Sequence, residues 1–237
     1  MMSLKQTARL AGFLFFILVV TGVFAEFYVR QNIFVYKDIA ATARNIIENE
    51  WLFRLGFVAD LVMSTAFFFY AFLLYIVFKN VHKNGALLLF LSITISVAMY
   101  CQNMLYQFSA LELLQNKSYS EGFGMEQLEL LSSFFLNMHG RGYMVNQIFY
   151  GLYLFPLGYM IYKSGVAPKW LGIILMLGCL GDFVDFVTYF LFPNTSSVVL
   201  QNITIPADVG ELLFCLWLMI WGVREKNIKL IAMPVRP

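Results

Sequence analysis

Two carboxylates, Asp182 and Asp185, lie three residues apart near the middle of an apolar segment. A helix places residues with this spacing on the same face, so both carboxyls point to one side. A charge at the centre of a bilayer costs about 2.5–3.5 kcal/mol on insertion scales, and such residues mark ion or ligand sites by default. The pair therefore predicts a site for a cation, a proton or a small polar ligand.

Polar and charged residues also interrupt the other apolar segments, and they gather toward one end of each. The candidate chamber residues are Arg54, Asp60, His139, Arg141, Asn146, Asp182, Asp185 and Glu211. We expect them to line one carboxylate-rich chamber that is open to the extracytoplasmic side and binds a cation or small ligand. No catalytic residue is assigned among them, and the metal and the cofactor remain unknown.

Carboxylates outnumber arginines in this set, and an unpaired carboxylate is costly away from water. Protonation of some carboxyls, a bound cation and hydration are three open ways to compensate the excess. Glu26 and Arg30 have i,i+4 spacing, so we interpret them as a structural pair. Arg54 and Asp60 are six residues apart and point about 120° apart on a helix, so we expect each of them to find a partner on another helix. Asp208 suits the first turn of a helix and is set aside as structural.

The elements that must position these residues are membrane-spanning helices. The chain is 60% hydrophobic and only 13% charged, whereas soluble domains carry about 25% charged residues. Runs of about 20 apolar residues can cross a bilayer, and open strands cannot. The predicted spans are about 10–29, 52–78, 86–111, 138–162, 170–192 and 207–223. The fold class is therefore an all-α polytopic transmembrane helical bundle of six spans, with residues 1–237 forming a single integral membrane domain.

The charges of the connections predict the orientation of the bundle. The N-terminus, the second-to-third and fourth-to-fifth connections and the C-terminal tail carry lysine and arginine, and the other connections carry mostly aspartate and glutamate. The positive-inside rule then places both termini in the cytoplasm of a multi-pass protein in the plasma membrane. Amphipathic stretches at about 38–50 and 125–136 are typical of helices lying at the outer surface.

The first apolar segment also resembles a signal peptide that would be cut after Ala25. Cleavage there would leave five spans and an outside N-terminus. The apolar core is long for a signal, and cleavage would separate Glu26 and Arg30 from their helix. We therefore expect the segment to remain as the first span.

No sequence motif of a soluble enzyme is present. There is no Gly-rich phosphate loop, no HExxH and no GxSxG. The three cysteines show no CxxC spacing, and the net charge of +2 is too small to indicate nucleic acid. We expect a non-enzymatic protein. A membrane hydrolase that uses a metal or acid/base pair, and a membrane sensor or accessory subunit, remain alternatives. Expected partners are the lipid bilayer and a cation or small-molecule ligand, with a homo-oligomer left open.

Four stretches resemble a known family when read in order. They are ARLAGFLFFILVVTGVFAEFYVR at 8–30, LFRLGFVADL at 52–61, YGLYLFPLGYMIYKSGVAPKWLG at 150–172 and GELLFCLWLMIWGV at 210–223. On these residues the chain resembles domain-of-unknown-function family 4386, small bacterial and archaeal membrane proteins. The resemblance implies a six- or seven-helix bundle without an assigned activity, and it favours keeping the first span.

Overall fold

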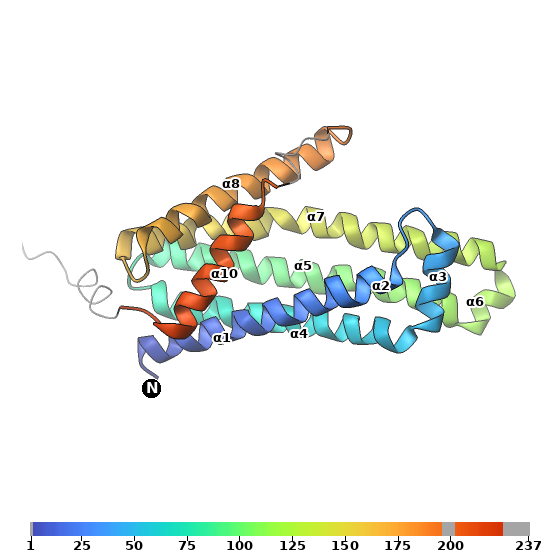
Figure 1. Cartoon of the computed structure of the whole chain (residues 1–237), viewed down its shortest axis with the longest axis horizontal. Coiled ribbons are helices and arrows are strands. Elements are labelled where there is room, and N and C mark those ends of the chain that lie inside the picture. The colour runs from blue at the N-terminus through green and yellow to red at the C-terminus, as the bar shows by residue number, and fades with distance from the viewer. Residues whose placement is uncertain (1, 196–201, 225–237) are drawn as a thin grey trace, which may run out of the picture. The chain divides into compact units, whose positions relative to one another are not determined.

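The computed structural model describes residues 2–195 and 202–224, and every regular element within them is a helix (Figure 1). The helices in chain order are α1 (Leu4–Val23), η1 (Phe24–Arg30), α2 (Gln31–Ile33), α3 (Ile39–Glu48), α4 (Glu50–Phe78), α5 (Lys83–Gln115), α6 (Lys117–Gly122), α7 (Met125–Ser164), α8 (Lys169–Leu191) and α10 (Ile205–Ile220). The predicted all-α class is confirmed for the described residues. The basic tail residues Lys226, Lys229 and Arg236 lie outside them.

Four helices are long and apolar enough to cross a membrane. They are Leu4–Ile33, which joins α1, η1 and α2, together with α4, α5 and α8. These four correspond to the first, second, third and fifth predicted spans. Their lengths of 23 to 33 residues exceed the roughly 20 residues that a bilayer requires.

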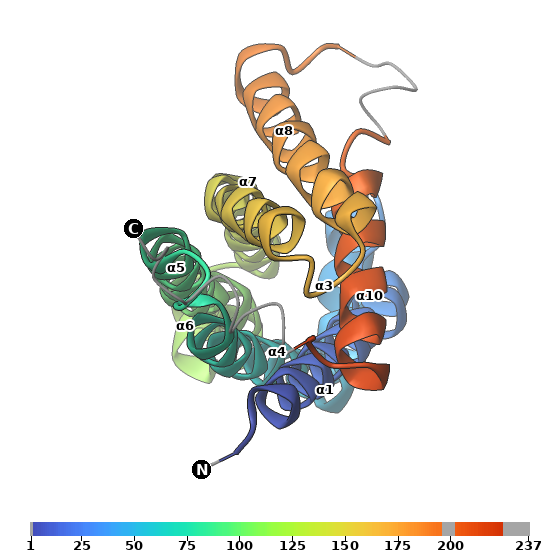
Figure 2. The ribbon, with the colours of Figure 1, turned by 90° about the vertical axis from the view of Figure 1, so that its left-hand side faces the viewer.

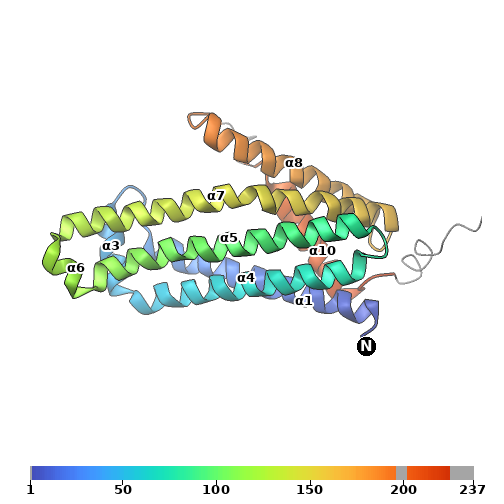
Figure 3. The same ribbon diagram turned by 180° about the vertical axis from the view of Figure 1, so that it is seen from behind.

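Helix α7 contains the fourth predicted span but is much longer. It runs without interruption for 40 residues and includes Pro156 in its interior. The predicted outer helix at 125–136 and the predicted span at 138–162 are therefore one continuous helix, as Figure 3 shows for α7 beside α5. Its apolar part is interrupted by His139, Arg141 and Asn146, which explains its weaker apolar character.

Helix α10 contains the sixth predicted span and is only 16 residues long. It ends where Gly222 adopts a left-handed conformation with φ of 68°. The Gly222 N–H donates to the carbonyls of Leu218 at 3.0 Å and Trp217 at 3.3 Å, so these last carbonyls of the helix keep a partner. Glycine adopts this φ at the lowest steric cost, which fixes the end of the helix.

The chain divides into two compact units. Unit 1 contains residues 1–16, 66–97 and 144–237, and unit 2 contains residues 17–65 and 98–143. In unit 2 the core joins α2, α3 and the adjoining parts of α4, α5 and α7 through buried apolar side chains. These are Val29, Ile33, Ala43, Ile46, Phe53, Leu111, Leu114 and Leu128. Asp38 caps α3 by accepting from the Ala41 N–H at 2.8 Å, which fixes the start of this amphipathic helix.

In unit 1 glycines bring helices into direct backbone contact. A Cβ on Gly172 of α8 would lie 2.5 Å from the carbonyl oxygen of Gly158 in α7. On the α10 side, a Cβ on Gly178 would lie 2.6 Å from the Cα of Ala207, and one on Gly181 would overlap the carbonyl oxygen of Ile203. Small residues allow this approach in membrane helices. The glycines of α8 thus allow close packing on α7 and α10, and Figure 1 shows α8 lying across α10.

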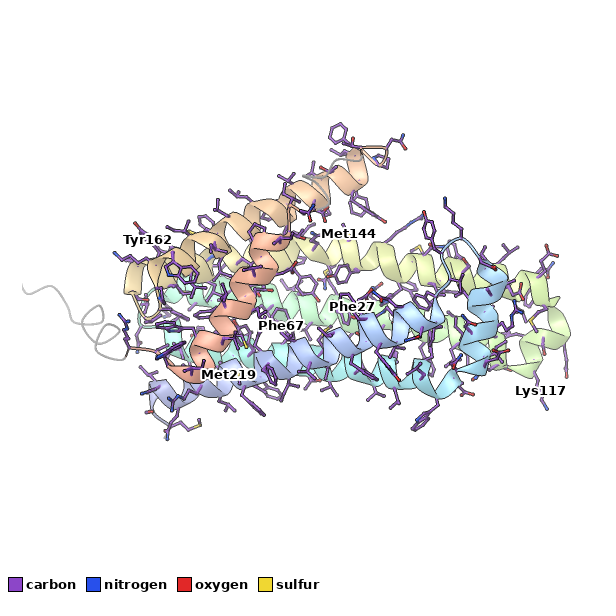
Figure 4. The ribbon with its side chains drawn as sticks, in the orientation of Figure 1. Phe27, Phe67, Lys117, Met144, Tyr162 and Met219 are labelled. Atoms are coloured by element: carbon purple, nitrogen blue, oxygen red, sulfur yellow. The ribbon has the colours of Figure 1, made fainter. Side chains whose placement is uncertain are left out.

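Helix α10 also packs against the first helix of unit 1. A Cβ on Gly12 would lie 2.8 Å from the backbone nitrogen of Met219, a residue labelled in Figure 4. The Cys215 Sγ contacts the Gly12 carbonyl oxygen at 3.3 Å, and Cys101, Cys179 and Cys215 are all free thiols. Helices α1, α8 and α10 thus form one tightly packed group, and α8 and α10 carry the carboxyls of interest.

Candidate functional site

The eight candidate residues fall into the two units. Arg54, Asp60, His139 and Arg141 belong to unit 2, whereas Asn146, Asp182, Asp185 and Glu211 belong to unit 1. Within each unit the structure places their side chains in definite surroundings, which we describe one unit at a time. Their assembly into a single chamber stays a prediction.

In unit 2 Asp60 is the centre of a buried ion pair. Its side chain is 2% exposed, and its Oδ2 accepts from Arg30 Nη2 at 2.5 Å. Its other oxygen, Oδ1, accepts from the Tyr100 hydroxyl at 3.0 Å. Both carboxylate oxygens therefore have charged or polar donors. Asp60 does find its partner on another helix, as predicted, but it is a compensated carboxylate and has little need of a bound cation.

The arginine that pairs with Asp60 comes from the π-helix η1. Arg30 also contacts Glu26 at 3.2 Å, which confirms the predicted i,i+4 pair. The same guanidinium also reaches across to Asp60 of α4. Gly56 allows this approach, since a Cβ there would lie 2.7 Å from the Val29 side chain. A π-turn widens a helix locally and is frequent at functional sites.

Arg54 is held at one end of α4, away from Asp60. Its Nε donates to Glu50 Oε1 at 2.6 Å, and its Nη2 donates to Gln115 Oε1 of α5 at 3.2 Å. The guanidinium also lies 5.5 Å from the centre of the Phe108 ring. The Arg54 guanidinium is thus bound by side chains of unit 2, which favours a structural role for this residue.

His139 of α7 is locked to Asn103 of α5 by two hydrogen bonds. The Asn103 amide nitrogen donates to the His139 backbone carbonyl at 2.8 Å, and His139 Nδ1 lies 3.2 Å from the Asn103 carbonyl oxygen. The Asn103 amide nitrogen also lies 3.3 Å from Nδ1, so this ring nitrogen faces both an amide donor and a backbone acceptor of Asn103. The Tyr100 ring packs edge-on against the imidazole at 6.3 Å between centroids. Arg141, two residues further on, lies on the exposed face of α7.

Two glycines that flank Arg141 are expected to respond oppositely to alanine. A Cβ on Gly142 would lie 2.6 Å from Asn103 Cγ and would overlap its Oδ1, whereas a Cβ on Gly140 meets nothing within 4 Å. Gly142→Ala must displace the Asn103 amide from His139, so we expect a loss of about 1–3 kcal/mol in the free energy of unfolding. Gly140→Ala should instead gain about 0.5–1 kcal/mol, because alanine favours a helix over glycine.

Denaturant-dependent unfolding of the two purified variants in detergent measures this difference. Each variant adds one methyl group, and the two positions are two residues apart on one helix, so each is a control for the other. Equal stabilities would show that Asn103 does not hold His139 in the way described.

In unit 1 Asn146 of α7 contacts α5. Its amide nitrogen donates to the Ser96 carbonyl at 3.1 Å, and the residue is 1% exposed. Asn146 Oδ1 and Ser96 Oγ both lack a hydrogen-bond partner within the described part of the chain. Buried polar atoms of this kind are usually satisfied by an ordered water, so the pair is a place for a bridging molecule.

Asp182 and Asp185 of α8 meet Gln147 of α7. The Gln147 amide nitrogen donates to Asp185 Oδ2 at 2.9 Å, and Gly151, one turn further along α7, lies against the Asp182 Cβ. Asp182 and Gln147 are each 7% exposed. The Gln147 amide oxygen has no hydrogen-bond partner among the described residues. A buried acceptor thus lies beside two carboxyls, which concentrates negative potential in this part of unit 1.

Two further carboxyls come from α10. Asp208 lies in the first turn, as predicted, and is exposed, yet its carboxyl is within electrostatic range of Asp182. Its neighbour Ala207 packs against Gly178, which explains this proximity. Glu211 is half-buried and lies within range of Tyr70 of α4. We call Asp182, Asp185 and Asp208 the carboxyl cluster.

Among residues 2–195 and 202–224, no lysine, arginine or histidine forms an ion pair with the carboxyl cluster. The ion pairs of the described residues are Arg30–Glu26, Arg30–Asp60 and Arg54–Glu50, all in unit 2. Within residues 2–195 and 202–224, no three or more His, Cys, Asp or Glu side chains are arranged to hold a metal ion by themselves. Any cation bound at the cluster must therefore take part of its coordination from amide or backbone oxygens, or from water.

Several residues of these surroundings were not in the predicted set of eight, among them Arg30, Tyr100 and Gln147. Gln147 has the clearest signal in the sequence, because it adjoins Asn146 in the same apolar stretch. Tyr100 lies one turn before Asn103 and Met104 on α5. A tyrosine at such a position is typical of a membrane interface, so the sequence alone provided no reason to assign it to the site. Arg30 could not be assigned to Asp60 because the π-turn shifts its direction.

The long apolar helices and the embedded polar groups define the class of this chain: an α-helical protein with helices able to span a membrane. It belongs to the family described as Domain of unknown function (DUF4386), whose model matches residues 10–222. This finding confirms the resemblance seen in the sequence.

One relative is an uncharacterized protein of Archaeoglobus fulgidus. It is 36% identical over 81 residues, which cover 34% of this chain and 46% of the relative. The match thus spans about half the length of that protein. No solved structure matches the chain.

Proposed function

We propose that this chain is a plasma-membrane protein with six membrane-crossing helices and that its carboxyl cluster binds a small cation. The observation that carries the proposal is the local charge. In the part of the chain that the structure describes, Asp182, Asp185 and Asp208 form no ion pair, and the buried oxygen of Gln147 beside them has no hydrogen-bond donor. A bound cation would supply the missing positive charge and use the free amide oxygen.

The proposed orientation follows from the ends of the helices. In unit 1 the α4–α5 turn and the α7–α8 turn carry lysines, and the start of α10 carries Asp208. The positive-inside rule puts the lysine-bearing turns and both termini in the cytoplasm. Asp182 lies 13 residues after the first residue of α8, about 20 Å along its axis. The carboxyl cluster would then be reached from the extracytoplasmic side, with α7 and α10 as the two further spans.

Oxygen ligands limit the kind of cation. Carboxylate and amide oxygens suit hard ions such as Na⁺, K⁺, Mg²⁺ and Ca²⁺, and these donors discriminate against soft metals that prefer thiolates. The cysteine on the same helix, Cys179, is buried and free, and its sulfur is not among the donors we assign. We therefore place the site in the class of alkali or alkaline-earth ion sites.

Thermal unfolding of the purified full-length chain in detergent tests the proposal. The midpoint is recorded with Na⁺, K⁺, Mg²⁺ or Ca²⁺ at constant ionic strength, with choline chloride as the reference. A bound ion at 100 times its dissociation constant stabilises the folded state by about 2.7 kcal/mol, so one of these ions should raise the midpoint above that in choline. Asp182→Asn and Asp185→Asn should each weaken the ion's affinity about tenfold or more.

Glu126→Gln is the matched control, because Glu126 is an exposed carboxylate at the start of α7 and lies outside the cluster. It should leave the ion response unchanged. The proposal fails if none of the metal ions raises the unfolding midpoint above its value in choline. It also fails if Glu126→Gln reduces the ion-induced rise in the midpoint as much as Asp182→Asn does. Unfolding midpoints in choline show whether each variant is folded.

A further inference from the structure

One end of unit 1 exposes a group of lysines that the proposed cation site does not use. The α4–α5 turn contributes Lys79 and Lys83, and the α7–α8 turn contributes Lys163 and Lys169; all four are exposed. Contact between the rings of His82 and Tyr159, with centroids 5.8 Å apart, joins the two turns. Figure 2 looks onto unit 1 from this side. We call these four lysines the basic surface.

The charge of the basic surface is uncompensated. Residues 66–97 contain no aspartate or glutamate, and neither do residues 144–181. The ion pairs within the described part of the chain all belong to unit 2. Among the described residues, four positive charges therefore lie on two adjoining turns whose own segments carry no carboxylate, which creates a local field that attracts an anion.

Aromatic rings lie among these lysines. Lys163 Nζ lies 5.6 Å from the centre of the Tyr159 ring, and Lys169 Nζ lies 5.4 Å from that of Tyr162, which Figure 4 labels. Trp170 follows directly and is exposed. Tyrosine and tryptophan are enriched at the level of lipid headgroups, where one end of the ring is apolar and the other is wet. The basic surface therefore has the composition of a membrane interface.

A helix also begins at the basic surface without a side-chain cap. Helix α8 starts at Lys169, and its preceding residue, Pro168, makes no side-chain cap. The first N–H groups of a helix and the positive end of its dipole attract phosphate oxygens. Beyond this first turn α8 exposes Ile173 and Leu177, and α5 exposes Leu87 and Leu88. A ligand with a phosphate and apolar chains would match both features.

We propose that the basic surface binds the phosphate of an anionic lipid headgroup. The lysines and the start of α8 hold the phosphate oxygens, the aromatic rings lie beside the glycerol region, and the exposed leucine and isoleucine side chains meet the acyl chains. This site is independent of the carboxyl cluster, and either can fail without the other.

Native mass spectrometry of the full-length chain in detergent tests the proposal. The chain is titrated with phosphatidylglycerol and, separately, with phosphatidylcholine of the same acyl chains. We expect tighter binding of phosphatidylglycerol, and we expect K163Q/K169Q to reduce its affinity about tenfold or more, because each lysine near an anionic headgroup contributes substantially to binding. The lipid should also raise the thermal unfolding midpoint of the unaltered chain but not that of the variant.

The matched control is K37Q/K117Q. It removes two exposed lysines of unit 2, one of which also lies over a tyrosine ring, with Lys37 Nζ 5.0 Å from the Tyr36 centroid. It should keep the preference for phosphatidylglycerol. Equal binding of the two lipids, or an equal loss in both double variants, would overturn the proposal. Inorganic phosphate that displaces phosphatidylglycerol at equimolar concentration would do so as well, since it would indicate a free-phosphate site.

Discussion

Replacing Asp60 with alanine should lower the free energy of unfolding by about 3–5 kcal/mol. The substitution leaves the Arg30 guanidinium, whose side chain is only 14% exposed, without its carboxylate. It also removes the acceptor of the Tyr100 hydroxyl. Breaking one side of a buried pair is costly because the remaining charge keeps its desolvation penalty. Denaturant-dependent unfolding of the purified chain in detergent measures the change.

Glu26→Ala is the matched control, since it removes the other carboxylate that contacts Arg30. The Glu26 side chain is 58% exposed, and exposed pairs contribute only about 0–1 kcal/mol. Tyr100→Phe should fall between the two, at about 1.5–3 kcal/mol, the range for a hydrogen bond to a charged group. If Asp60→Ala costs no more than Glu26→Ala, the ion pair does not stabilise unit 2.

Replacing Gly158 with alanine should cost about 3 kcal/mol or more, the upper end of the range for overpacking. The added Cβ would overlap the Gly172 carbonyl oxygen and lie 2.8 Å from Met176 Cγ. A backbone carbonyl cannot move aside as a flexible side chain does, so α7 and α8 must separate. The same movement would pull Gln147 away from Asp185, because the two residues belong to the same pair of helices. Unfolding in detergent measures the loss.

Gly140→Ala on the same helix is the reference for this experiment, because nothing lies within 4 Å of the added Cβ. It should be neutral or stabilising. Gly172→Ala approaches the same contact from α8 and should match Gly158→Ala. If each of these two variants lowers the free energy of unfolding by less than about 1 kcal/mol, α7 and α8 are not in tight backbone contact at this crossing.

The positions of the helices were predictable because an apolar run of about 20 residues has few alternatives to a spanning helix. The boundaries were less predictable. The outer helix at about 125–136 and the fourth span at about 138–162 were predicted as separate elements, yet α7 continues from Met125 through both. Helical backbone hydrogen bonds are satisfied within the segment whatever the side chains, so polarity alone does not end a helix.

The electrostatic partners were predictable only in part. The count of embedded charges predicted more carboxylates than arginines, and among the described residues Asp182, Asp185 and Asp208 in unit 1 form no ion pair. The pairing of Asp60 could not be derived, because helical spacing assumes 3.6 residues per turn and η1 departs from it. The hydrolase and sensor alternatives, like the single chamber, remain predictions.

Because of the π-helix, the number of residues in the first helix determines the direction of the Arg30 side chain as much as their types do. Residues Phe24–Arg30 form one wide turn, and everything after it is rotated relative to an ordinary α-helix. A π-turn advances about 80° per residue and an α-helix about 100°, so the same residues wound as an α-helix would turn Arg30 by about 100° around the axis, away from Asp60. Loss of one residue between Phe24 and Arg30 would compensate for this difference. Relatives that lack one residue here should therefore form an ordinary α-helix and still keep a basic and an acidic residue at the positions of Arg30 and Asp60.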